Sequence, residues 1–201
     1  MLRITDLLEV PDRGEASFDG DDILALSPHG RIDYRRKMAM VFQQSALYNA
    51  SVYDNVAMGL RIRGIDKQMT KERAEEALKA VNLYDLRAAR AHSLSGGEAQ
   101  RLCLAGALIV EPEGLLLDEP MANLDPANAI IVEGIVRDYA SEKRGIVVFT
   151  THNMFEAKRL ADRVLLLIDG RVVEEGDAVE VLDRPKEDMT ARFLRGEIVF
   201  G

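Results

Sequence analysis

Residues 94–125 read LSGGEAQRLCLAGALIVEPEGLLLDEPMANLD, and this stretch decides the fold. Near its end, residues 114–117 form a short uninterrupted apolar run, which is typical of a parallel strand buried on both faces. The run stops at Asp118, Glu119 and Pro120. Because ligands of open α/β sheets bind beyond the carboxyl ends of the strands, the pattern predicts an α/β protein with two carboxylates at the rim of a site.

Two adjacent carboxylates in this position suit phosphoryl transfer. One can hold Mg²⁺ while the other orients a water molecule. Burying both without a cation or hydrogen-bond partners would be costly. The alternative is that Asp118 and Glu119 only close the strand, with the turn set by Pro120.

The beginning of the stretch predicts a capped helix. Ser95 and Glu98 have the spacing of a capping box, which accounts for those two residues by structure alone. It does not account for Gly96 and Gly97, since each glycine in a first helical turn costs about 1 kcal/mol relative to alanine. A glycine pair at the positive end of a helix indicates close approach of a ligand, and phosphate is the ligand such an end favours.

Four motifs in this order carry a family resemblance. The segments are LSGGEAQR at 94–101, LLLDEP at 115–120, ANLD at 122–125 and TTH at 150–152. They resemble the signature, Walker B, D-loop and switch histidine of ABC-type ATPases, and the resemblance covers nearly the whole chain. It implies an α/β fold of the P-loop NTPase type, with a mainly parallel sheet and a helical subdomain, which we place at residues 46–105.

The resemblance also implies the cofactors, ATP and Mg²⁺, and the roles of individual residues. Catalysis would fall to Glu119, His152 and Gln43, and metal binding to Asp118 and Gln43. Gln43 follows the apolar run 38–42 and takes the place of the family's Q-loop glutamine. The residues that would contact ATP across a dimer are Ser95, Gly96, Gly97, Glu98 and Asp125.

One element of the family is missing from the sequence. A Walker A loop needs Gly-Lys-Ser or Gly-Lys-Thr, and no lysine here follows a glycine. The segment from Leu2 to Gly14 resembles the one that follows this loop in the family, and we expect residues 2–8 to be the remainder of a helix that ends before Pro11 and Gly14. We therefore expect residues 1–201 to be one ABC ATPase domain without its N-terminal strands and phosphate loop, inactive alone. In-frame codons for the loop just upstream of Met1 would support a misassigned start.

Composition narrows the possible partners. The net charge of −8 argues against a nucleic-acid surface, and Cys103, the one cysteine, fits a reducing compartment. No apolar run approaches the roughly 20 residues of a membrane span. The resemblance implies a peripheral place on the cytoplasmic face of the plasma membrane. Its implied partners are transmembrane permease subunits, a second ATPase subunit and, indirectly, an extracytoplasmic solute-binding protein.

The most specific hypothesis is an ATP-hydrolysing subunit that powers a prokaryotic importer of a small anion. The segments ALYNASVYDNV at 46–56 and THNMFEA at 151–157 are similar in sequence to those of ATPase subunits of oxyanion importers for tungstate or phosphate. The alternative is a non-catalytic subunit that donates only the signature motif to a composite site. A DNA-repair or ribosome-associated factor of the family predicts a coiled-coil insertion or a tandem copy, and neither is present.

Several other segments have definite expectations. Residues 145–150 resemble a third buried strand, residues 126–139 a helix, residues 163–168 and 171–175 a hairpin, and the basic run 28–37 a solvated face. Helical spacing predicts one helix through Val56 and a second beginning near Thr70. Two interpretations stay open for one apolar group, a docking surface for a membrane subunit or the core of the helical subdomain. That group is Leu47, Tyr48, Val52 and Tyr53.

Overall fold

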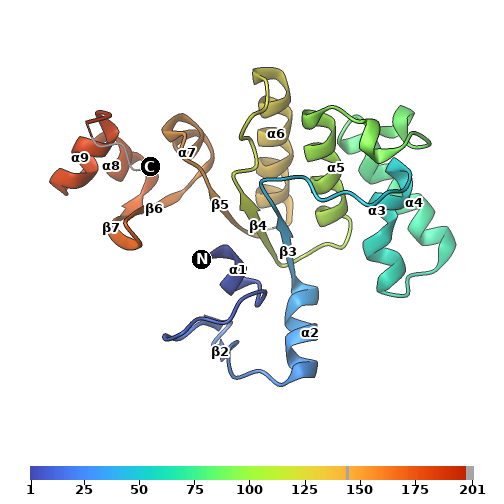
Figure 1. The fold of residues 1–201 in the computed structure, drawn as a ribbon, viewed down its shortest axis with the longest axis horizontal. Coiled ribbons are helices and arrows are strands. Elements are labelled where there is room, and N and C mark those ends of the chain that lie inside the picture. Colours follow the sequence, from blue (N-terminus) through green and yellow to red (C-terminus); the bar gives the residue numbers. More distant parts are fainter. Residues whose placement is uncertain (144, 198–201) are drawn as a thin grey trace. The chain divides into compact units, whose positions relative to one another are not determined.

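The computed structural model describes residues 1–143 and 145–197 (Figure 1). The chain forms two compact units, Met1–Thr150 and Thr151–Gly201, and each is described by itself. Within the described residues, no helix is both long enough and apolar enough to cross a membrane.

A parallel sheet organises the first unit. Its strands are β3 (Met38–Val41), β4 (Gly114–Asp118) and β5 (Ile146–Thr150), in the order β3-β4-β5. β4 is the central strand, and Leu115, Leu116 and Leu117 are buried on both of its faces, as the apolar run predicts. The register pairs Asp118 with Thr150, so β4 and β5 end at the same rim.

Two helices accompany the strands. α5 (Gly96–Leu108) precedes β4, and α6 (Pro126–Lys143) connects β4 with β5, four residues longer than the sequence pattern predicts. Figure 1 shows α5 and α6 running side by side, and contacts join them to each other and to β3 and β5. Parallel neighbours require such crossover connections.

A second core fills the space between α5 and two further helices. α3 (Val52–Ile62) is capped by Ser51. α4 (Lys67–Ala80) is capped by Asp66 and begins at Lys67, three residues before the expected start near Thr70. The side chains buried between the three helices are Val52, Val56, Leu60, Ala74, Leu78, Leu102 and Ala105. The range 46–105 for a separate helical subdomain stays a prediction.

The N-terminal segment differs most from expectation. α1 (Leu2–Thr5) is a single turn, and Leu7 has a φ of 53°, so the helix does not continue to residue 8. β1 (Ser17–Phe18) and β2 (Asp21–Asp22) form a small hairpin around Asp19 and Gly20. Both turn residues have positive φ, 52° and 87°, as the Asp-Gly pair predicts.

The basic run is solvated, as predicted, but it is also a helix. α2 (Pro28–Lys37) begins at Ser27, whose hydroxyl accepts a hydrogen bond from the backbone N–H of Gly30, 3.2 Å away. A serine followed by a proline at the first helical position is typical of a helix start. This signal was missed because only the charge of the run was considered. Tyr34 is buried while Arg35, Arg36 and Lys37 are exposed.

The second unit contains α7 (Met154–Leu160), β6 (Arg163–Ile168), β7 (Arg171–Asp177), α8 (Ala178–Asp183) and α9 (Asp188–Leu194). β6 and β7 form the expected antiparallel hairpin, which turns at Asp169 and Gly170 with φ values of 47° and 72°. β7 extends two residues beyond the predicted end.

Candidate functional site

The carboxyl ends of β4 and β5 place three polar side chains together. The Thr150 hydroxyl donates to Asp118 Oδ1 at 2.7 Å and accepts the Glu119 backbone N–H at 3.0 Å. One hydroxyl therefore links the two predicted acidic residues. Thr150 lies inside the TTH segment, but nothing in that motif indicates this bridging role.

A third residue joins the rim from the loop after β3. The Gln43 side-chain amide donates from Nε2 to Glu119 Oε2 at 3.0 Å. Gln43 is exposed and Glu119 is half-buried, so the pair lies at the surface of the unit. The structure thus brings together Gln43, Asp118 and Glu119, the three rim residues expected to handle metal and water.

These residues suit Mg²⁺ by their chemistry. Among the described residues, no three His, Cys, Asp or Glu side chains are grouped so as to hold a metal alone. Mg²⁺ needs no such cage, because it keeps several waters and binds one or two carboxylates together with phosphate oxygens. Asp118 and the Gln43 amide oxygen offer oxygen ligands of the required kind.

The N-terminus of α5 has the predicted capping box. The Ser95 hydroxyl accepts the Glu98 backbone N–H at 3.4 Å, and Glu98 Oε2 accepts the Ser95 backbone N–H at 2.8 Å. Hydrogen bonds from the Ser95 hydroxyl and backbone lower the pKa of the Glu98 carboxyl. Glu98 is thereby assigned a structural task whether or not it contacts a nucleotide.

The two glycines of the signature have different environments. A Cβ on Gly97 would lie 2.6 Å from Nδ2 and 2.7 Å from Oδ1 of Asn128, so a larger residue here would force the Asn128 side chain to move. Contact with Asn128 gives a packing reason for Gly97, and the predicted approach of a ligand to this glycine stays a prediction. Gly96 is exposed, and a Cβ there would meet nothing within 4 Å. Close approach by a phosphate therefore remains a prediction for Gly96.

Asn128 also connects the signature helix with the segment 122–125. Its side chain donates to Asp125 Oδ2 and accepts from the Arg101 guanidinium. Asp125 caps α6 through the backbone N–H groups of Ala127 and Asn128, each at 3.0 Å. Asp125 and Gly97 thus share one neighbour, Asn128, which sequence reasoning missed because the residue belongs to none of the four motifs.

His152 is exposed and lies at the start of the second unit, in the loop between β5 and α7. Its neighbours in the chain are firmly held. The Thr151 hydroxyl and the Asn153 amide both donate to the Glu156 carboxylate, at 2.6 Å and 3.0 Å, and Asn153 caps α7. Its role as a γ-phosphate switch stays a prediction.

The fold and the acidic rim together define a nucleotide-hydrolysing α/β protein. The family model described as ABC transporter matches residues 1–122, and the chain belongs to this family of ATPases. The resemblance and the fold class predicted from the motifs are therefore confirmed.

Individual relatives agree with this assignment. The chain is 38% identical over 209 residues to the phosphate import ATP-binding protein PstB 2 of Natronomonas pharaonis, covering 100% of this chain and 73% of that protein. It is 36% identical over 200 residues to the methionine import ATP-binding protein MetN of Legionella pneumophila, covering 98% and 58% of the two chains.

A solved structure matches the fold. The dimeric post-hydrolysis state of the ATP-binding cassette MJ0796, bound to ADP and Pi, superposes with a TM-score of 0.81 at 28% identity. The match covers 88% of this chain and 78% of that one.

Proposed function

We propose that this chain is the ATP-binding subunit that powers a membrane importer of a small anion. The names of the relatives support import, and the match to the phosphate import protein of Natronomonas pharaonis, which spans the whole of this chain and 73% of that protein, supports an anion. The match to a methionine importer shows that this part of the sequence is shared across substrates. A solute-binding protein outside the cell would deliver the anion to the permease.

The catalytic part of the proposal rests on one observation. Gln43 and Thr150 contact the acidic pair, Asp118 and Glu119. Asp118 would hold Mg²⁺ together with Gln43, and the ion would neutralise phosphate charge. Glu119 would accept a hydrogen bond from the attacking water and orient it. Gln43 already occupies Glu119 Oε2 at 3.0 Å, so it must share or release that oxygen when water binds.

We further propose that ATP is held between two subunits. One subunit would supply Gln43, Asp118, Glu119 and His152, and the other would supply Ser95, Gly96 and Gly97. The exposed N-terminus of α5 supports this, because Ser95 and Gly96 are exposed and a Cβ on Gly96 would meet no atom within 4 Å. The dimeric cassette to which the chain is similar supports it as well.

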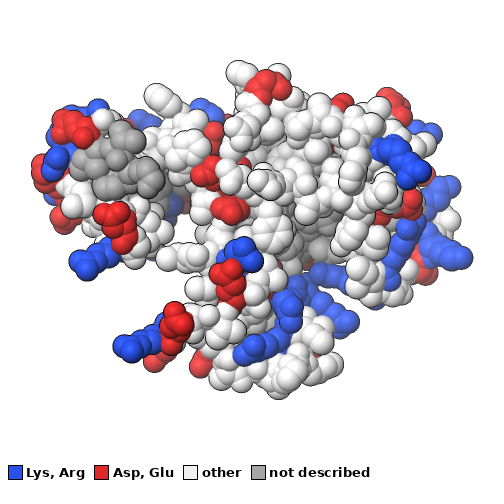
Figure 2. Space-filling model, in the orientation of Figure 1, with Lys and Arg blue, Asp and Glu red and all other residues white. Residues whose placement is uncertain are grey.

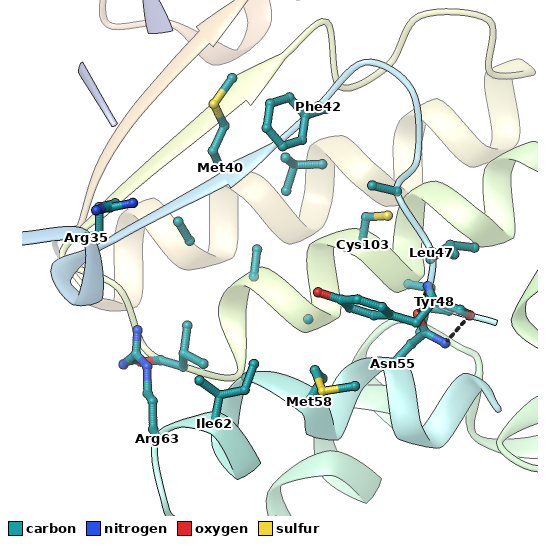
Figure 3. Close-up of a pocket in the computed structure, with 18 of the residues that line it drawn as sticks. Arg35, Met40, Phe42, Leu47, Tyr48, Asn55, Met58, Ile62, Arg63 and Cys103 are labelled. Carbon is teal, nitrogen blue, oxygen red and sulfur yellow. Dashed lines mark hydrogen bonds between the residues drawn. The ribbon is translucent and has the colours of Figure 1, made fainter. Parts of the chain in front are cut away.

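We propose that the membrane permease binds at a cavity in the first unit. A cavity of about 630 Å³ lies between β3, α3 and α5, and Figure 3 shows the apolar side chains Met40, Phe42, Met58 and Ile62 around it. Tyr48 is 58% exposed, and the Asn55 side chain fixes its backbone through bonds of 2.8 Å and 3.1 Å. An exposed aromatic residue held rigidly at a cavity favours a protein partner.

The positive charge at one end of the cavity favours an acidic partner segment. Arg35 and Arg63 lie at one end of the cavity (Figure 3), and Figure 2 shows basic side chains gathered over α2. We therefore propose that a cytoplasmic segment of the permease with an apolar face and an acidic side chain occupies the cavity. The chain would then sit peripherally on the cytoplasmic face of the membrane.

The four residues of the apolar group, Leu47, Tyr48, Val52 and Tyr53, differ in how exposed they are. Val52 is fully buried in the helical core, and Leu47 and Tyr53 pack against that core. Tyr48 alone of the four is exposed. The proposed surface therefore keeps Tyr48 and Leu47, which line the cavity, and gains Met58 and Ile62 from α3.

The composite site can be tested with this chain supplying only its signature. The partner is a copy extended at its N-terminus by a strand and Walker A loop and carrying a defective signature. Gly96→Asp in this chain should abolish ATP turnover by the mixture, because a carboxylate would face the phosphates. Gly96→Asn, of equal size and no charge, should retain more turnover, and Glu119→Gln in this chain should change little. Equal losses from Gly96→Asp and Glu119→Gln would contradict the proposal.

A second candidate is a subunit that donates only its signature to a composite site, for which the exposed Ser95 and Gly96 would suffice. Extending this chain by a Walker A loop separates the two functions. The catalytic function is supported if the extended chain hydrolyses ATP and if Glu119→Gln nearly abolishes this turnover while ATP binding is kept. No turnover by a folded extended chain supports the second candidate.

A further inference from the structure

The loop after β3 contacts two functional elements within three residues. Gln43 donates to Glu119 at the rim of the sheet, at 3.0 Å. Two residues further on, the Ser45 hydroxyl donates to Gln100 Oε1, also at 3.0 Å. Gln100 lies on α5, in the turn that follows Gly97. The loop therefore connects the acidic pair with the signature helix of the same chain.

Gln100 is a polar residue in a buried position. It is only 4% exposed, and within the described part of the chain its Nε2 has no hydrogen-bond partner. Rotating the amide by 180° would exchange its two ends and still leave one end unpaired. A buried unpaired amide costs free energy that leucine of similar size would not. Packing alone therefore does not explain the glutamine.

The contact between loop and helix extends beyond this one bond. Burial raises the pKa of the Cys103 thiol, and hydrogen bonds with the Ser45 side chain and the Ala46 backbone partly offset that rise. Cys103 is one turn after Gln100 on α5 and lines the same cavity as Ala46. The segment 45–46 thus lies along the helix rather than touching it at a single atom.

We propose that Ser45 and Gln100 are positioning residues that couple the placement of Gln43 to the placement of the signature helix. Two residues span at most about 7 Å, so the backbone at Gln43 stays within that distance of Ser45, and a larger displacement of the loop at the rim must also move Ser45. Movement of Ser45 would deprive the Gln100 amide of its one hydrogen bond. A change at the acidic rim is then passed to the N-terminus of α5.

This inference rests on the proposed two-subunit site and specifies its regulation. In such a dimer, Gln43 and Glu119 serve one ATP, whereas the signature of the same chain serves the other. Ser45 and Gln100 would therefore link the two ATP sites through a single subunit. Neither residue is assigned to contact ATP.

The first test needs no nucleotide. Hydrogen–deuterium exchange over residues 42–47 of this chain is compared for wild type, Ser45→Ala, Gln100→Leu and the double variant. Each single variant should exchange about fivefold faster there, the effect of losing one ordinary hydrogen bond. The double variant should be no faster than Ser45→Ala alone, because Ser45→Ala already removes the bond to Gln100. Unchanged exchange, or effects that add, would overturn the link.

Two variants serve as controls. Ser45→Thr keeps a hydroxyl and should retain wild-type exchange. Ser93→Ala removes an exposed hydroxyl that donates to the Arg90 carbonyl, close to the signature but outside the link. It should leave residues 42–47 unchanged.

The second test uses the mixed dimer described above, in which this chain supplies only its signature. Ser45→Ala should lower kcat at least about threefold with an unchanged KM for ATP, although Ser45 lies outside that site. Ser45→Thr should leave kcat unchanged. Wild-type kcat for Ser45→Ala would overturn the coupling while leaving the proposed function intact. No turnover with the unaltered chain would instead count against the proposed function, and the exchange measurement would then decide the link.

Discussion

At Glu119 the backbone enters the left-handed region, with a φ of 44°. A residue with a side chain pays for this conformation, and such strain persists only where the surroundings hold it. Here the Thr150 hydroxyl holds it by accepting the Glu119 N–H at 3.0 Å. The Asp118 carboxylate contacts Thr150 and the Glu119 carboxylate contacts Gln43, so the two can take different roles at one rim.

Thr150→Val should lower ATP turnover of a Walker A-bearing form of the protein by about tenfold or more. Valine preserves the shape and β-propensity of the residue but leaves the Glu119 N–H and Asp118 Oδ1 without their shared partner. The measurement is steady-state ATPase activity across a Mg²⁺ titration, in which the Mg²⁺ requirement should also rise. Thr150→Ser should retain most activity. A valine variant with wild-type turnover would show that the bridge is dispensable.

Asp6 predicts a pH dependence of stability. Burial raises the pKa of this carboxyl from 3.8 to about 6, and the charge of Arg35 only partly opposes the rise. Between those two values the folded chain binds more protons than the unfolded chain, so Asp6 makes stability fall as pH increases from about 4 to 6.

Urea unfolding at pH 4.5, 5.5 and 7 should therefore show Asp6→Asn gaining stability relative to wild type as the pH rises. Asp12→Asn, which removes an exposed carboxylate nearby, is the control for loss of charge. A difference between Asp6→Asn and wild type that stays constant with pH would contradict the assignment.

At the scale of elements, α4 shows what holds the three-helix core together. Its polar composition makes it a surface helix, and it is fixed by a narrow apolar stripe, with Ala74 and Leu78 fully buried. Asp66 caps it by accepting two backbone N–H groups, both at 3.0 Å. The stripe and the cap decide where the helix starts and which face turns inward.

Leu78→Ala should reduce the free energy of unfolding by about 2–5 kcal/mol, since it removes a buried side chain and leaves a cavity. Met69→Ala, in the same helix but 44% exposed, should cost well below 1 kcal/mol. Chemical denaturation followed by far-UV circular dichroism measures both. Similar losses from the two variants would mean that α4 is not packed as described.

At the scale of the whole molecule, the proposed docking cavity makes a prediction about charge. Ile62 lines the cavity and is 73% exposed, next to the basic end formed by Arg35 and Arg63. Ile62→Asp should sharply reduce co-purification with the permease, because it would repel an acidic segment, and Ile62→Lys should reduce it less.

Ile130→Asp provides the matched control. Ile130 is 68% exposed on α6 and does not line the cavity, so an aspartate there should leave co-purification unchanged. Equal effects of aspartate and lysine at Ile62 would remove the argument for an acidic partner segment.

Much of the architecture follows from local signals. The run 114–117 predicts a central strand, and Ser95 with Glu98 predicts the start of α5; both predictions are confirmed. α2 was missed as a helix because its charge hid the Ser27 cap and because its single buried residue, Tyr34, gives no helical period. The predicted ends of α1 and α6 were wrong because helix ends depend on what the following residues pack against.

The sequence by itself determined the family, the order of the motifs and the rim that carries Asp118, because apolar runs and cap residues act over a few neighbours in the chain. Tertiary structure alone decided that Thr150 joins Asp118 to Glu119, that Asn128 explains Gly97, and that Ser45 reaches Gln100. Each of these contacts joins residues 31 or more positions apart. No local pattern specifies such a pair, because only the parallel sheet and the packing of α5 against its neighbours bring the two side chains within hydrogen-bonding or van der Waals distance.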